Sequence, residues 1–274
     1  MSFLPQIPLT GPAGWRFLER TAPAQQAAFE KGPALRREIA HFEAAIGAVG
    51  SAAELVADRR LLKVALGAFG LEGEIDKRAF LRRVLEDPVF AGRLTDPAFR
   101  RFAEAFGFAE PFGPKTGRPG FAAGIAAAYR TRAFEAAVGE TSPDLRLAMT
   151  FRREIAELAR GEGASWFALL GSKPLRTVIE KAYGLPKDFG RIDVDRQRDM
   201  LRDRTARLFG ARELTAFADP ANVQKVIDRF LVRAQLEAGP GGGGAPTSPA
   251  LALLAGAAQG SAGLMNLLAA RRQA

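Results

Sequence analysis

Residues 64 to 71 read VALGAFGL, and residues 178 to 185 read VIEKAYGL. Both stretches place apolar residues three and four positions apart, which is typical of one face of a helix, and both end in an aromatic residue, a glycine and a leucine. Glycine adopts the left-handed backbone conformation without Cβ strain, so it commonly ends a helix, and the residue after it packs back on the last turn. We therefore predict two helix ends, with a positive φ at Gly70 and at Gly184.

The same helical spacing recurs along the chain, whereas the two-residue alternation of a strand is almost missing. Helix-start signals precede several of the apolar stripes. Ser51 and Glu54 have the spacing of a capping box, and Asp96, Ser142 and Asp219 each stand before a proline as candidate N-caps. The sequence therefore predicts an all-α protein.

The two opening stretches belong to a longer pattern that occurs twice. In each copy a segment containing Arg-Arg-Glu-Ile-Ala comes first, then the glycine, then an Asp-Pro pair. The landmarks are 36–40, Gly70 and Asp96 in the first copy, and 152–156, Gly184 and Asp219 in the second. Their common order predicts an internally duplicated multi-helix globular unit.

Two segments rich in glycine and proline divide the chain. Residues 109–120 lie between the two copies, and residues 239–246 include four consecutive glycines. We expect a first helical unit with an N-terminal arm and a linker over residues 1–120, and a second helical unit over 121–238. Residues 239–274 would form a flexible linker and an apolar C-terminal tail.

Several catalytic chemistries lack the residues that they need. Cysteine is absent, and His41 is the only histidine, so neither a thiolate nucleophile nor a multi-histidine metal site can form. The dipeptide Gly-Lys never occurs, which excludes the usual phosphate-binding loop. We therefore predict no catalytic residue, no metal and no cofactor.

The densest group of carboxylates lies at residues 193–203, among arginines. We predict that Asp195–Arg198 and Asp199–Arg202 form local ion pairs on a solvated helix, because residues three apart are neighbours on a helix surface. Trp15 and Trp166 are interpreted as core anchors.

The chain is basic, with a net charge of +9 and a pI of about 10.4. Arginines occur as adjacent pairs that are dispersed and mostly near acids, which favours solvated helix faces. The alternative is a basic protein that binds nucleic acid or an anionic surface, and it requires these charges to gather on one face. The pairs begin at Arg36, Arg59, Arg82, Arg100, Arg152 and Arg271.

The C-terminal tail is uncharged from Ala250 to Ala270. Its polar residues and glycines disfavour a bilayer-spanning helix, so we expect no integral membrane span. Two short apolar segments can dock in a groove of another protein as a helix; the alternatives are packing on the chain's own domain and disorder. The candidate partner-docking residues are Leu251, Leu254, Leu264, Met265, Leu267 and Leu268. The N-terminus lacks the pattern of a standard secretory signal. We expect a cytoplasmic protein, and export by a route without a cleaved signal is the alternative.

Five blocks of the sequence resemble an alphaproteobacterial family known as domain of unknown function 1217. They are GWRFLERT at 14–21, DRRLLKVALGAFGL at 58–71, RRVLE at 82–86, AFGF at 105–108 and LFG at 208–210. The resemblance covers about residues 1 to 236, and the 61–71 block carries it most strongly. The connection at Asp87-Pro88 is shorter than in relatives. Members of that family are helical and are often described as flagellar or flagellum-associated, and no catalytic or cofactor residue carries over from them.

Together these observations favour a non-enzymatic helical interaction protein, whose partner is another protein rather than nucleic acid. The resemblance implies that the partner is a flagellar component and that the protein is associated with the flagellum.

Overall fold

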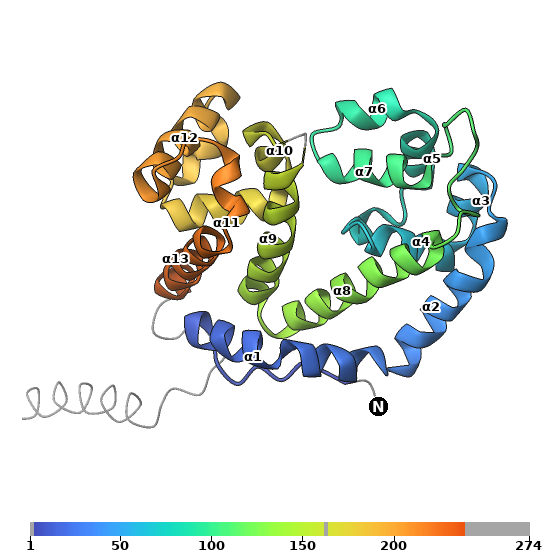
Figure 1. Ribbon diagram of the computed structural model, residues 1–274, viewed down its shortest axis with the longest axis horizontal. Coiled ribbons are helices and arrows are strands. Elements are labelled where there is room, and N and C mark those ends of the chain that lie inside the picture. Colours follow the sequence, from blue (N-terminus) through green and yellow to red (C-terminus); the bar gives the residue numbers. More distant parts are fainter. Residues whose placement is uncertain (1–2, 162–163, 239–274) are drawn as a thin grey trace, which may run out of the picture.

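The computed structural model describes residues 3–161 and 164–238, and every regular element within these residues is helical (Figure 1). The all-α prediction is confirmed. The α-helices are α1 (Gly11–Glu30), α2 (Pro33–Ala45), α3 (Ala52–Ala57), α4 (Arg59–Gly67), α5 (Arg78–Glu86), α6 (Pro88–Arg93), α7 (Pro97–Phe106), α8 (Phe121–Thr141), α9 (Pro143–Arg160), α10 (Trp166–Gly171), α11 (Lys173–Tyr183), α12 (Val194–Phe209) and α13 (Pro220–Ala238). Four short 3₁₀ segments join them: η1 (Ile46–Ala48), η2 (Glu72–Glu74), η3 (Lys187–Arg191) and η4 (Leu214–Ala218).

The buried apolar side chains form two separate cores. The first core lies among α2 to α7, and the second lies among α9 to α13. Helix α8 runs from one to the other (Figure 1) and contributes to both: Ile125 and Tyr129 belong to the first core, and Phe134 and Val138 to the second. The two cores are therefore joined by a continuous helix rather than by a loop.

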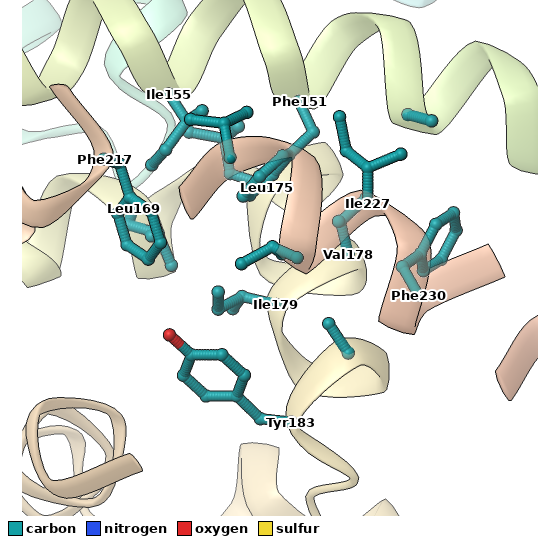
Figure 2. Close-up of a cluster of buried hydrophobic side chains, with 14 of the residues drawn as sticks. Phe151, Ile155, Leu169, Leu175, Val178, Ile179, Tyr183, Phe217, Ile227 and Phe230 are labelled. Atoms are coloured by element: carbon teal, nitrogen blue, oxygen red, sulfur yellow. The ribbon is translucent and has the colours of Figure 1, made fainter. Parts of the chain in front are cut away.

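Helix α1 packs with the second core although it comes first in the chain. It contacts α8, α9 and α13, and its Trp15 and Leu18 are almost fully buried there. Trp166 of α10 belongs to the same core, so both tryptophans are core anchors, as predicted. Figure 2 shows the centre of this core, where Phe151 and Ile155 of α9 meet side chains of α11 and α13.

Both predicted helix ends are present. Gly70 and Gly184 have φ values of +76° and +61°. In each case the following leucine returns its backbone N–H to the carbonyl five residues earlier: Leu71 to Leu66 at 3.0 Å, and Leu185 to Glu180 at 3.0 Å. This bond satisfies a carbonyl that the end of a helix leaves without an intrahelical donor. The structural duplication and the boundary at residue 120 stay predictions.

Three of the four predicted N-caps make their hydrogen bonds. Ser51 accepts from the Glu54 amide at 3.2 Å, and Asp96 and Asp219 accept from amides of α7 and α13 at 2.8 and 2.9 Å. The prediction for Ser142 is wrong, because this buried serine makes no side-chain cap hydrogen bond at the start of α9.

Candidate functional site

A cleft of about 660 Å³ lies between the two cores. Its walls come from the α4 helix end and the start of α7 on one side, and from α9 and the start of α11 on the other, with α8 between them. Two smaller cavities of about 350 and 210 Å³ adjoin it, and Arg101 lines all three. This is where side chains from distant parts of the sequence converge.

Glu154 of α9 contacts two arginines and a serine in the cleft. It is 6% exposed and pairs with Arg132 of α8 at 3.0 Å, while Arg153 lies 3.5 Å from the same carboxylate oxygen. The Ser172 hydroxyl donates to its second oxygen at 3.5 Å. Burial, together with the neighbouring Arg153, lowers the pKa of Arg132, although a guanidinium remains charged in proteins.

Glu135 of α8 forms the second half of this network. Arg153 donates to it with two nitrogens, at 2.9 and 2.8 Å, and the Thr150 hydroxyl donates at 3.1 Å. Burial acts to lower the pKa of Arg153, but the hydrogen bond and the charge of Glu135 outweigh it, so the pKa of Arg153 is raised. Two-pronged arginine–carboxylate pairs of this kind fix geometry as well as charge.

The two cores also touch at both edges of the cleft. Gly171 at the end of α10 lies so close to the Thr95 carbonyl that a Cβ at this position would be 2.2 Å from the carbonyl oxygen. At the opposite edge Arg146 of α9 pairs with Glu72 of η2 at 2.7 Å, with both side chains exposed. The cleft therefore lies between the cores, beside a buried network that ties α8 to α9, and contacts at its edges join the two sides.

Asp96 and Arg101 are the remaining charged groups in the cleft wall of α7. Asp96 caps the helix, and burial raises its pKa against the opposing effect of that hydrogen bond and of Arg101. The Nε atom of Arg101 is buried and has no hydrogen-bond partner among the described residues.

The chemistry that this arrangement allows is limited by its own internal pairing. The carboxylates of Glu135 and Glu154 already accept hydrogen bonds from arginines and hydroxyls, and Asp96 accepts from a backbone amide. A general base needs a carboxylate or imidazole with a free lone pair in reach of a substrate. No cluster of His, Asp and Glu in residues 3–161 and 164–238 has the number and proximity to hold a metal ion. The arginine–carboxylate pairs link α8 to α9.

The site residues predicted from the sequence all belong to the C-terminal tail. All six candidate docking residues of the tail, Leu251, Leu254, Leu264, Met265, Leu267 and Leu268, lie outside the residues that the structure describes. In the acidic helix α12, Arg198 pairs with Asp195 at 2.8 Å, as predicted, and also with Asp199 at 2.9 Å. The prediction of an Asp199–Arg202 ion pair is wrong, because Arg202 forms its ion pair with Glu213.

Sequence reasoning missed the cleft because no local pattern marks it. Arg152 and Arg153 look like one more solvated pair, yet only the first is exposed, where it stacks on Trp15 with 4.3 Å between guanidinium carbon and ring centroid. Arg153 is partly buried in the network, so the solvated-face interpretation is wrong for this residue. Its partner Glu135 is 18 positions away, and only the packing of α8 on α9 brings the two together.

None of the helices described here is both long enough and apolar enough to cross a membrane.

Comparison with known proteins gives one family and one solved structure. The model of a family described as protein of unknown function, DUF1217, matches residues 68–223. The crystal structure of a structural-genomics target from Agrobacterium tumefaciens is similar over 85% of this chain and 99% of that one, with a TM-score of 0.70 and 24% identity. At this identity the likeness shows a shared fold. No curated protein matches the sequence.

Proposed function

We propose that this chain, which belongs to the DUF1217 family, is a non-enzymatic helical protein that works by binding another protein. The observation that carries the proposal is the internal pairing of the cleft. Its buried carboxylates are engaged by Arg132, Arg153 and nearby hydroxyls, which supports a rigid scaffold rather than an active site. The family resemblance supports a cytoplasmic, flagellum-associated role with a flagellar component as the partner.

A basic protein that binds nucleic acid or an anionic surface is the second candidate, and the net charge of +9 favours it. Against it, most of the adjacent arginine pairs within the described residues have a member bound to a carboxylate. Arg59 pairs with Asp76, Arg82 with Glu86, Arg100 with Glu104 and Arg152 with Glu19. Positive charge that is already neutralised in this way contributes little to an electrostatic footprint.

The test is affinity purification of the full chain from its native cell at about 50 and 200 mM salt. Binding through six to ten phosphates would fall by roughly 10³ to 10⁵ over this range, because each neutralised phosphate releases counterions. We expect a defined protein that co-purifies at both salt concentrations, and flagellar export, basal-body or hook components would support the flagellar role. Recovery of ribosomal proteins and nucleic acid that are lost at the higher salt would contradict the proposal.

A further inference from the structure

Three arginines gather around the C-terminal end of α11. Arg204 of α12 donates to the Tyr183 carbonyl at 3.2 Å, and Arg229 of α13 donates to the Ala182 carbonyl at 3.4 Å. The guanidinium of Arg233, one turn further along α13, covers Gly184, where a Cβ would lie 2.6 Å from one of its nitrogens. Because these contacts fall on three consecutive residues, the three positive charges are close neighbours. We call them the arginine triad.

Among the described residues the arginine triad has no acidic partner. Within the described residues none of its guanidinium groups has a carboxylate oxygen within 4.0 Å, and the nearby Glu237 is paired with Lys181 at 3.0 Å. The end of a helix carries only about half a negative charge, which cannot balance three cations. Each guanidinium also has five N–H donors, of which the helix end uses few. The triad therefore has both charge and donors to offer an anion.

The part of α12 that carries Arg204 is held in place by buried contacts. Tyr183, labelled at the end of α11 in Figure 2, shares a hydrogen bond of 2.8 Å with Thr205, the residue after Arg204. Thr205 also donates to the Leu201 carbonyl of its own helix at 2.8 Å. These bonds fix α12 against α11, so that the entropy cost of ordering Arg204 around a ligand is already reduced.

The exposed face of α13 beside the triad is partly apolar. At 100° per residue, Lys225, Arg229, Val232, Arg233 and Leu236 fall within an arc of about 100°. Val232 and Leu236 are 45% and 75% exposed. A face that alternates cations with aliphatic side chains complements a segment that carries carboxylates and apolar residues at helical spacing.

The same face suits nucleic acid poorly. Single strands bind where aromatic side chains stack on bases along a basic groove. The strongly exposed aromatic residues of the described chain, Phe112 and Phe167, lie in the 109–120 segment and in α10.

We propose that the arginine triad, with the α13 face beside it, binds an acidic, partly apolar segment of the partner protein. The inference rests on the proposed function, because it takes the ligand to be a protein, and it assigns the surface on which that ligand lies. The chain's own tail is a poor candidate for this surface, because residues 250–270 contain no acidic side chain.

The test uses fluorescently labelled poly-L-glutamate and the full chain, with binding followed by fluorescence anisotropy at about 50 mM salt. The variant is Arg229→Gln with Arg233→Gln. The matched control is Arg16→Gln with Arg20→Gln, which removes two exposed arginines, also four residues apart on a helix and also without a carboxylate within 4.0 Å in the described residues. Thermal melting of both variants checks that they are folded.

We expect the triad variant to bind poly-L-glutamate about tenfold more weakly, since two exposed charge pairs account for a loss of this size, and the control to change less than about twofold. Equal losses in the two variants would mean that only net charge matters, and would overturn the proposal. A single-stranded oligonucleotide of equal length is the competing ligand. If the chain binds it more tightly than poly-L-glutamate, and the triad variant loses the same affinity for it, the surface belongs to nucleic acid instead. If deletion of residues 247–274 strengthens poly-L-glutamate binding severalfold, the tail is the occupant and the proposal fails.

The co-purification experiment separates this inference from the proposed function. If the triad variant binds poly-L-glutamate as tightly as the parent chain does, and the native partner still co-purifies with the chain, the assigned surface is wrong and the proposed function stands.

Discussion

The C-terminal ends of α4 and α11 have the same backbone conformation but different electrostatic surroundings. Gly70 and Gly184 both have a positive φ, and both are followed by a leucine that bonds back to the carbonyl five residues earlier. At Gly70 the covering guanidinium belongs to Arg132, which Glu154 neutralises at 3.0 Å. At Gly184 the covering guanidinium is Arg233, one of three arginines without a carboxylate partner in the described residues.

Local sequence and tertiary packing therefore control different properties of the same helix end. The aromatic–Gly–Leu pattern determines how the helix ends, because the left-handed residue and the returning amide are local. Which charges surround that end depends on helices that pack there from elsewhere. The first end faces the cleft between the cores, where charges must be paired, whereas the second faces outward and can keep unpaired charges for a ligand.

Loss of Glu154 is the largest effect that we expect. Glu154→Gln leaves Arg132 and Arg153 with a buried neutral neighbour, and removing one partner of a buried ion pair costs about 3–5 kcal/mol of unfolding free energy. At the second helix end, Arg233→Gln should change stability by no more than about 0.5 kcal/mol, because its exposed guanidinium has no carboxylate within 4.0 Å among the described residues. Urea denaturation of both variants measures the contrast.

A double variant controls for loss of packing. Arg132→Met with Glu154→Leu removes both charges and keeps apolar volume, so it should be markedly less destabilised than the sum of the two single variants. A cost below about 1 kcal/mol for Glu154→Gln would show that the network does not stabilise the packing of α8 on α9, and the contrast between the two ends would be lost.

Alanine at the two glycines separates backbone strain from crowding. A left-handed non-glycine residue costs about 1–2 kcal/mol at either position. At Gly70 the new Cβ also lies 2.7 Å from an Arg132 nitrogen that Glu154 holds in place, whereas at Gly184 it meets Arg233, which is exposed and free to move. We expect Gly70→Ala to cost about 1 kcal/mol more than Gly184→Ala, in line with overpacking of a fixed site.

Gly210 supplies the reference for this pair. Its φ is +75° and no atom lies within 4 Å of a Cβ built there, so Gly210→Ala reports strain alone. Chemical denaturation of the three alanine variants should order the losses as Gly70, then Gly184, then Gly210. A Gly184→Ala variant less stable than Gly70→Ala would mean that the outer arginines are the more rigid ones.

The two serine N-caps give a smaller contrast between the halves of the chain. Ser51→Ala removes a cap that accepts from the Glu54 amide, and should cost about 1 kcal/mol. Ser142→Ala removes a hydroxyl without a cap bond and should cost no more than a few tenths of a kcal/mol. Differential scanning calorimetry resolves the two, and equal shifts in Tm would show that the Ser142 hydroxyl has a role that the structure does not give it.

The Arg146–Glu72 pair at the rim of the cleft should have the smallest effect. Both side chains are more than 40% exposed, so Arg146→Ala is expected to cost only about 0.2–1 kcal/mol. Raising the salt concentration should remove the difference from the parent protein, because exposed pairs are screened. If Arg146→Ala lowers the unfolding free energy by more than about 1 kcal/mol at every salt concentration, this pair stabilises the fold as a buried ion pair does.

Much of the fold could be predicted from the sequence, because helix spacing, caps and helix-ending glycines are local signals. Gly70, Gly184 and the Ser51 cap all behave as their neighbours in the sequence indicate. The cleft and the arginine triad could not be predicted, since Arg153 and Glu135 sit on different helices, and Arg204 and Arg233 are 29 positions apart. An arginine on a solvated face and one in a buried network have the same local sequence, and only tertiary contacts distinguish them.

Hydrogen–deuterium exchange of the full chain, with and without poly-L-glutamate, tests the contrast between the two helix ends most directly, because both are observed in one sample. We predict that added protection appears at residues 181–186 and along 225–237, where the triad lies, while residues 66–72 exchange at an unchanged rate. Protection at residues 66–72 and along the cleft, with none at residues 181–186, would contradict the assignment of the binding surface to the second helix end.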